Sequence, residues 1–193
     1  MIHLRELTIF NFLFYLANAL WLLEFIFFRN QKKSGRFQEK KSFWFLTSAI
    51  GLVILTTIYF SRMDWGKVVN TPIYPTLQVS ALGFYAVGLW LRYQGSSLLG
   101  ANFTRHVAVS SEMVLVSKGP YRYLRHPLYL GLMLITIAFP LFVGNLLAFF
   151  INLPILVIGF SWRMHVEEKA LASLHPQYLS WAKKRFRFIP FIY

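Results

Sequence analysis

Apolar residues gather along this chain into long runs, separated by shorter polar segments. The first three runs extend from Leu7 to Phe28, from Phe43 to Phe60 and from Leu77 to Leu91. Each approaches the roughly 20 residues that a helix needs to cross the hydrocarbon core of a bilayer. Inside lipid the backbone polar groups must bond within the segment, which a helix achieves. These runs therefore predict three membrane-spanning helices.

The apolar stretch in the second half of the chain is too long for one crossing. It runs from Leu128 to Phe139, is interrupted at Pro140, and resumes from Leu141 to Trp162. One long kinked helix or a tight hairpin of two helices would each accommodate it. Since one crossing needs only about 20 residues, we favour the hairpin, with its turn at Gly144-Asn145. The pattern predicts an all-α integral membrane protein with about five transmembrane helices and a C-terminal helical hairpin.

Composition supports the membrane class. The chain is 56% hydrophobic and 14% charged, whereas soluble domains carry about a quarter charged residues. Its net charge of +13 comes from basic residues that flank the apolar runs. Such flanks orient a protein in the membrane and attract anionic lipid headgroups. We therefore expect membrane lipid, and no nucleic acid, as a partner. Because the chain has no cysteine, disulfides, thiolate nucleophiles and Cys metal ligands are excluded.

The loops differ in basic residues, and this difference predicts the orientation. The connection after Phe28, the one that begins at Arg92 and the tail after Trp162 are rich in Lys and Arg, whereas residues 61–76 are poor in them. Basic loops stay in the cytoplasm, so we expect the N-terminus outside and the C-terminus inside. The first run is too long for a signal-peptide core. We divide the chain into a three-span region, 1–91, and a C-terminal region, 92–193, with the hairpin and a cytoplasmic tail.

The segment from Gly119 to Tyr129 concentrates polar chemistry at the mouth of an apolar run, because it holds two arginines, a histidine and three tyrosines. Ionisable groups at a bilayer boundary indicate a site unless they are solvated or paired. A snorkelling basic anchor within an aromatic belt would look the same, and Arg122 and Arg125 suit that role. Arg163 and Glu167, four residues apart where the last run ends, share a helix face on the same membrane side.

The other ionisable residues give weaker signals. His165 and Glu168 are three apart on a predicted helix, but no second carboxylate–histidine pair supports a metal site. His106 and His175 stand in polar segments, where solvation is expected rather than ligation. Glu24 interrupts the first run without a charged neighbour in sequence. We predict no metal site.

Several motifs in the second half of the chain occur together. Met-Val-Leu-Val-Ser-Lys-Gly-Pro-Tyr-Arg-Tyr-Leu-Arg-His-Pro-Leu-Tyr-Leu-Gly begins at Met113 and precedes the predicted hairpin. Arg163-x-x-x-Glu167-Glu168-x-x-Leu171 follows the hairpin, with Tyr178 and Pro190 near the end. This combination resembles the isoprenylcysteine carboxyl methyltransferase family, integral membrane enzymes that use S-adenosylmethionine. The first three runs contain no residues that we can match.

The resemblance implies a cytoplasmic cofactor pocket and a role for each matching residue. A tetrapeptide that begins at Met113 would hold the cofactor largely through its backbone, His106 is a loose match, and Arg163 would serve the substrate as the catalytic residue. The implied cofactor-binding residues are His106, Met113, Val114, Leu115, Val116, Tyr121, His126, Pro127, Leu128, Tyr129 and Glu167.

These residue types suit the chemistry of S-adenosylmethionine, which carries a sulfonium, an ammonium and a carboxylate. Glu167 can accept hydrogen bonds, His126 can donate them, and tyrosine faces attract cations. Arg163 can hold an anionic acceptor bidentately. Methyl transfer is an in-line displacement that depends on alignment and on exclusion of water, so no covalent nucleophile is required.

The chain also departs from the family pattern. It has Leu174-His175-Pro176 where the family often has Phe-Gly, and Lys169 follows the second glutamate. These changes bear on the packing of the tail and on substrate fit more than on the cofactor.

The resulting prediction is a membrane methyltransferase that acts on a lipophilic small molecule or prenylated peptide, most simply on the carboxylate of a prenylated cysteine. A phospholipid N-methyltransferase is the alternative enzyme, and a non-catalytic scaffold or transporter is the alternative class, although no inverted repeats support a transporter. A relative of membrane sterol reductases, with a nicotinamide cofactor, fits this short chain less well. We expect a prokaryotic plasma membrane. The sequence leaves the acceptor and the oligomeric state open.

Overall fold

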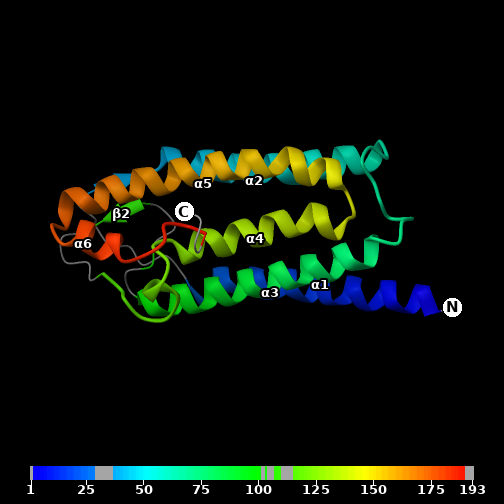
Figure 1. Cartoon of the computed structure of the whole chain (residues 1–193), viewed down its shortest axis with the longest axis horizontal. Coiled ribbons are helices and arrows are strands. Elements are labelled where there is room, and N and C mark those ends of the chain that lie inside the picture. The colour runs from blue at the N-terminus through cyan, green and yellow to red at the C-terminus, as the bar shows by residue number, and fades with distance from the viewer. Residues whose placement is uncertain (1, 29–36, 101–102, 104–106, 110–114, 190–193) are drawn as a thin grey trace.

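The computed structural model describes residues 2–28, 37–100, 103, 107–109 and 115–189. These residues form a bundle of long helices (Figure 1). The elements are α1 (Ile2–Phe27), β1 (Phe37–Glu39), α2 (Lys41–Arg62), α3 (Tyr74–Leu99), β2 (Val107–Val109), the 3₁₀ turn η2 (Gly119–Arg122), α4 (Pro127–Phe142), α5 (Leu146–Leu174) and α6 (Tyr178–Lys183). The two three-residue strands pair antiparallel, with Gln38 opposite Ala108. The predicted all-helical class is confirmed apart from this short pair.

Three helices are long and apolar enough to cross a membrane, namely the 9–27 part of α1, α2 and α5. The apolar α4 is shorter. Large apolar side chains remain exposed on the outside of the bundle, among them Phe12 (64%), Leu55 (66%) and Ile158 (62%). A water-soluble protein rarely exposes apolar surface on this scale, whereas lipid accommodates it. The multi-pass class is confirmed, and the number of crossings stays a prediction.

The predicted hairpin is present. Gly144 adopts φ +71°, a conformation that glycine takes without strain, and α5 begins directly after the turn. The side chain of Asn145 caps α5 by accepting the Ala148 N–H at 2.9 Å. Pro140 does not end α4, however, which continues to Phe142. The missing proline N–H removes only one bond near the end of the helix, where this loss is tolerated.

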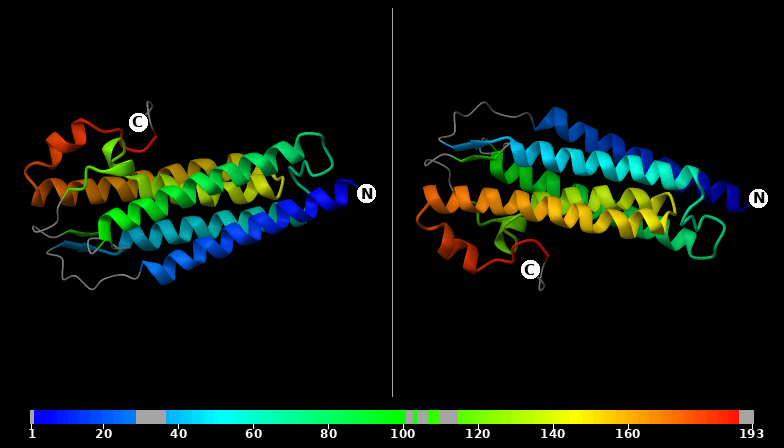
Figure 2. Two further views of the ribbon diagram at one scale, coloured as in Figure 1. Left: turned by 90° about the horizontal axis from the view of Figure 1, so that it is seen from below. Right: turned by 90° about the horizontal axis from the view of Figure 1, so that it is seen from above.

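In Figures 1 and 2, α4 lies between two helix pairs, α1 with α3 and α2 with α5. The backbones of α3 and α4 touch at two glycines, because a Cβ added to Gly88 would lie 2.7 Å from the carbonyl oxygen of Gly131, and the reverse also holds. Small residues allow this approach between membrane helices. Gly83, on the same helix, has nothing within 4 Å of such a Cβ and takes no part in this close approach.

Two apolar clusters fill the space on either side of α4. Leu156 and Phe160 of α5 pack with Val53 of α2 on one side. Phe14 of α1 stacks on Phe142 at 4.0 Å on the other. A polar contact also joins α2 to α5, because Thr56 donates to the side-chain oxygen of Asn152 at 2.8 Å. These contacts hold α4 in a defined position relative to α5.

The two ends of the bundle differ. The connection between α2 and α3, the turn between α4 and α5 and the start of α1 lie at one end, on the right in Figure 1. The strand pair, η2 and α6 lie at the other end. The loops that are rich in Lys and Arg thus lie at one end of the bundle and the loops that are poor in them lie at the other, as their composition predicts. Which group faces the cytoplasm stays a prediction.

Candidate active site

The polar residues of the 119–129 segment and those at the exit of α5 meet at the α6 end of the bundle. Gly119, with φ +54°, allows the turn into η2, and Pro127 suits the first turn of α4, where its missing N–H is not needed. His126 therefore lies at the N-terminal cap of α4, and Tyr129 one turn further on. Glu167 and Glu168 face them from α5.

A single hydroxyl connects the two predicted functional charges. Tyr129 donates to the carboxylate of Glu167 and accepts from Nε of Arg163 at 3.0 Å. The guanidinium of Arg163 also donates to Oγ of Ser42 on α2 at 2.6 Å and is 2% exposed. The sequence predicted that Arg163 and Glu167 share a face, and the structure adds that Tyr129 bridges them. Residues of three helices, α2, α4 and α5, thus meet around the buried guanidinium of Arg163.

A second carboxylate, Glu168, organises the histidine. Its Oε1 lies 3.1 Å from Nε2 of His126 and 3.4 Å from Nη1 of Arg125, and its Oε2 lies 2.9 Å from Nε of Arg187. The His126 ring also stacks on Tyr129, with centroids 5.5 Å apart. Sequence reasoning left Glu168 out of the site. The position of Glu168 directly after Glu167 in the sequence was the signal that could have identified it as a site residue.

The prediction that Arg125 is a snorkelling anchor is wrong. Its Nε donates to the carbonyl oxygens of Ala182 at 3.0 Å and of Arg185 at 3.2 Å, while its Nη1 faces Glu168. Carbonyls from the end of the chain satisfy this guanidinium, so it has no need to reach the headgroups. Arg122 is exposed, as an anchor should be, and its role stays a prediction.

Residues 178–189, which we call the C-terminal strap, cross the segments that hold the site. Nε1 of Trp181 donates to the carbonyl oxygen of Val116 at 3.2 Å and to Oγ of Ser117 at 2.9 Å. Nε of Arg185 donates to the carbonyl oxygen of Tyr121 at 2.7 Å. With Arg187 on Glu168, the strap therefore touches each of the three segments implied to bind the cofactor.

Two tyrosines of the site keep their protons. Burial raises the pKa of Tyr121 well above its usual range, and the nearby carboxylate of Glu167 raises it further. Burial also raises the pKa of Tyr178, with Glu168 as the next cause. A neutral phenol presents a hydroxyl donor and an electron-rich ring face. The site therefore offers carboxylates and aromatic faces together, which suits a cationic ligand.

Comparisons with known proteins point in one direction. Residues 81–173 match the isoprenylcysteine carboxyl methyltransferase family. A protein-S-isoprenylcysteine O-methyltransferase from Schizosaccharomyces pombe is 30% identical over 164 residues, which cover 79% of this chain and 68% of that protein. The chain belongs to the isoprenylcysteine carboxyl methyltransferase family. The match begins at Ala81, inside α3, earlier than the sequence motifs suggested.

The matched range of this methyltransferase family member contains all of the residues expected to form its site. Pro127 is fully buried, whereas Leu115, Val116 and Leu128 are partly buried. The predicted residues His106, Met113 and Val114 lie outside the residues that the structure describes. Among the residues it does describe, no group of three His, Asp or Glu side chains is placed to hold a metal ion.

Two further residues contradict their sequence-based interpretation. His175, expected to be solvated, is 5% exposed, and its Nε2 has no hydrogen-bond partner within the described ranges. Glu24, expected to lack a charged neighbour, is fully buried and accepts from Nε and Nη2 of Arg92 on α3, each at 2.5 Å. Nη1 of Arg92 reaches the carbonyl oxygen of Leu128 at 3.3 Å. This pair links α1 to the start of α4.

Proposed function

We propose that this family member is a membrane methyltransferase, which moves a methyl group from S-adenosylmethionine to the carboxylate of a prenylated cysteine or a similar amphiphile. The observation that carries the proposal is the Tyr129 hydroxyl, which joins Glu167 to Arg163. It puts an acceptor suited to the cofactor directly beside a cation suited to an anionic methyl acceptor.

The donor set fits the cofactor. Glu167 would accept from its ammonium, His126 would face its carboxylate, and the rings of Tyr121 and Tyr129 would lie against its cationic and adenine parts. The backbone of residues 115–116, held by Trp181, would contribute further hydrogen bonds. When bound, the cofactor supplies an electrophilic methyl group on a positive sulfur.

Arg163 would hold the acceptor. The planar guanidinium can bind both oxygens of a carboxylate. Ser42 and Tyr129 orient the guanidinium, so little reorganisation is needed when the acceptor arrives. A carboxylate already carries the electron pair that attacks the methyl group, and therefore no general base is required. Burial of Arg163 excludes water, which strengthens its attraction for the acceptor.

The environment of the site supports access for both partners. The site lies at the end of the bundle where the predicted cytoplasmic loops gather, so a water-soluble cofactor would enter from the cytoplasm. The prenyl tail would lie among the helices, in contact with lipid. An N-terminus outside and a C-terminus inside, and a prokaryotic plasma membrane, remain our expectations. The relative quoted above comes from a yeast.

Calorimetry with S-adenosylhomocysteine, the demethylated product of the cofactor, tests the cofactor site in detergent. We expect purified protein to bind it, and Glu167→Gln and His126→Ala each to weaken binding at least tenfold. Asp64→Asn removes an exposed carboxylate at the opposite end and should leave the affinity unchanged. Unchanged binding in both site variants would refute the assignment of Glu167 and His126 to the cofactor site.

Transfer of labelled methyl groups to a panel of acceptors tests the substrate. Prenylcysteines should be methylated, and Arg163→Lys should reduce their transfer because it loses the bidentate geometry. Methylation of phosphatidylethanolamine instead would establish the phospholipid N-methyltransferase alternative. Binding of S-adenosylhomocysteine without transfer to either class would refute both acceptor assignments.

A further inference from the structure

The outer side of the C-terminal strap, with the turn beside it, carries basic and apolar side chains together. Leu179 is 61% exposed, Tyr123 is 60% exposed and Phe186 is 37% exposed. We call this surface the strap face, and it consists of Lys118, Arg122, Tyr123, Leu179, Lys183, Lys184 and Phe186. The two parts are joined, because the Phe186 N–H donates to the carbonyl oxygen of Tyr123 at 2.9 Å.

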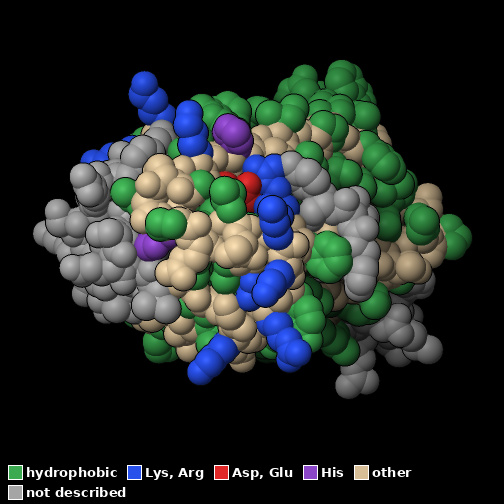
Figure 3. Space-filling view, turned by 60° about the vertical axis from the view of Figure 1, so that its left-hand side comes forward, with side chains coloured by type: hydrophobic (Ala, Val, Ile, Leu, Met, Phe, Trp, Pro, Cys, Tyr) green, Lys and Arg blue, Asp and Glu red, His purple; other side chains and the backbone are tan. Residues whose placement is uncertain are grey.

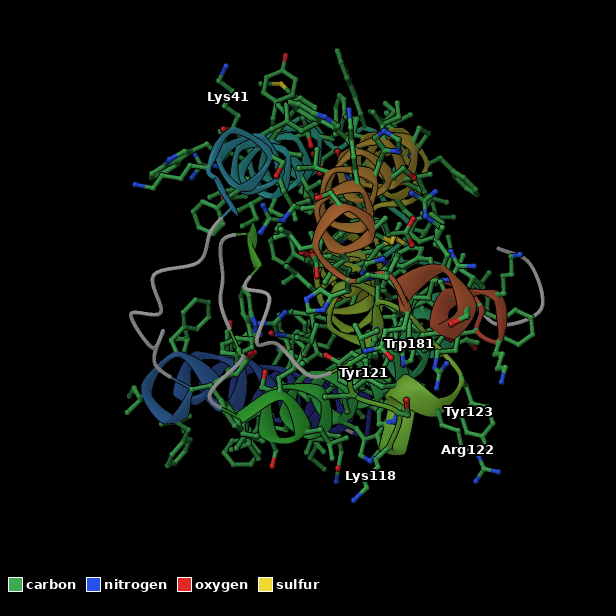
Figure 4. All side chains as sticks on the ribbon, turned by 90° about the vertical axis from the view of Figure 1, so that its left-hand side faces the viewer. Lys41, Lys118, Tyr121, Arg122, Tyr123 and Trp181 are labelled. Atoms are coloured by element: carbon green, nitrogen blue, oxygen red, sulfur yellow. The ribbon has the colours of Figure 1, made fainter. Side chains whose placement is uncertain are left out.

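Figure 4 shows Lys118, Arg122 and Tyr123 extending outward next to Trp181, whereas Lys41 lies on the far side of the same end. Figure 3 shows Lys and Arg side chains gathered over this end of the molecule. Tyr123 also carries the guanidinium of Arg122 over its ring, at 5.6 Å from the centroid.

The positive charge of the strap face has no internal partner in the described structure. Between residues 115 and 189 the sequence has two acidic residues, Glu167 and Glu168. Glu168 faces inward to His126, Arg125 and Arg187, and Glu167 accepts from Tyr129. Within the ranges that the structure describes, none of the basic residues of the strap face takes part in an ion pair. Within the described residues, the positive charge of the strap face is therefore available to an anionic ligand.

Exposed tryptophans indicate where the lipid headgroups would lie at this end of the bundle. Trp44 on α2, Trp90 on α3 and Trp162 on α5 are 62%, 55% and 42% exposed, all in the half of the bundle nearer the site. Exposed tryptophans of membrane helices favour the interface. Figure 2 shows α6 at the site end of the bundle, standing off its side. Exposed Leu and aromatic side chains among lysines are typical of a segment that lies in the interface plane.

We propose that the strap face docks on anionic phospholipid headgroups, and that this docking supports the cofactor site. The inner side of the strap holds Val116 through Trp181, Tyr121 through Arg185, and His126 through Arg187 and Glu168. Lipid that immobilises the outer side therefore immobilises these three segments as well. The docking is independent of the proposed function, and only the affinity experiment below rests on it.

The first experiment measures docking directly. Because the chain has no cysteine, Leu179→Cys provides a unique site for a spin label, whose depth is measured in nanodiscs of phosphatidylcholine alone or mixed with phosphatidylglycerol. We expect immersion in the anionic discs that high salt reverses. Adding Lys183→Gln and Lys184→Gln should weaken the docking equilibrium about 25-fold, at about fivefold for each lysine. Lys41→Gln is the matched control and should not change the depth.

Equal immersion in neutral and anionic discs, or equal effects of the control and the double variant, would overturn the proposal. So would a label that stays in water in anionic discs, the result expected if the face served an acidic protein.

The second experiment measures S-adenosylhomocysteine affinity in the same discs. We expect tighter binding in anionic discs for the wild type and no such gain for K183Q/K184Q. Both proteins should bind equally in detergent, which shows that the variant is folded. No gain for the wild type would refute the link to the site, whereas absent binding in detergent would instead refute the proposed cofactor.

Discussion

Removing one partner of the Glu24–Arg92 pair should destabilise the whole bundle. Glu24 is fully buried, Arg92 is 7% exposed, and two hydrogen bonds join them. A single substitution leaves the other charge in a low-dielectric interior, where the loss is typically about 3–5 kcal/mol. We therefore expect Glu24→Leu and Arg92→Met each to lower the free energy of unfolding by this amount. The fully buried position leaves little solvent to screen the remaining charge.

The double variant separates lost charge pairing from lost packing. Apolar replacements of similar volume on both sides of a buried pair are often neutral. Glu24→Leu with Arg92→Met should thus be more stable than either single variant, giving a coupling energy of at least about 2 kcal/mol in the double-mutant cycle. The assay measures unfolding in a denaturing detergent through the loss of the helical circular dichroism signal.

An exposed ion pair provides the reference. Lys67 and Asp64 form one at the other end of the bundle, where their side chains are 34% and 77% exposed. Because such pairs contribute about 0–1 kcal/mol, Lys67→Gln should have a small effect. Additive losses in the double variant, or single-variant losses no larger than that of Lys67→Gln, would refute the reasoning that the buried pair must be kept intact.

Three further predictions follow from the packing and the site. Gly88→Ala should cost about 1–3 kcal/mol of unfolding free energy by forcing α3 from α4, whereas Gly83→Ala, with open space around it, should not; equal thermal stability of the two would contradict the crossing. Tyr129→Phe removes the hydroxyl between two charges and should lower methyl transfer about tenfold or more, while Tyr59→Phe, on the exposed surface of α2, should leave the rate unchanged. Since the pKa of Tyr178 is raised on folding, its stabilising contribution is complete below pH about 10 and is lost as pH rises further; an ultraviolet titration in which Tyr178→Phe removes an early-ionising tyrosine would refute this.

Local signals in the sequence were sufficient for the hairpin but not for the buried pair. Gly144 and Asn145 predict a turn because of their own backbone preferences, and the structure confirms this turn. Glu24 and Arg92 are 68 residues apart, and only the packing of α1 on α3 brings them together. A residue read in isolation gives no indication of such a partner.

The candidate site divides in the same way. The family resemblance implied roles for Tyr129, Arg163 and Glu167, and the structure places them in one network. The sequence did not reveal the burial of His175 or the role of Glu168, because both depend on how the C-terminal strap folds back on the bundle. The C-terminal strap has no periodicity long enough to predict its path.

The Tyr129 bridge has a thermodynamic consequence. A ligand that takes over an oxygen of Glu167 changes the charge felt by the tyrosine hydroxyl, and this hydroxyl is also a partner of Arg163. The two ligands of the enzyme should therefore be linked, each altering the affinity of the other by one common factor. Measured as a ratio of dissociation constants with and without the second ligand, that factor should approach one in Tyr129→Phe. The Tyr129 hydroxyl would then couple the binding of the cofactor to the binding of the acceptor.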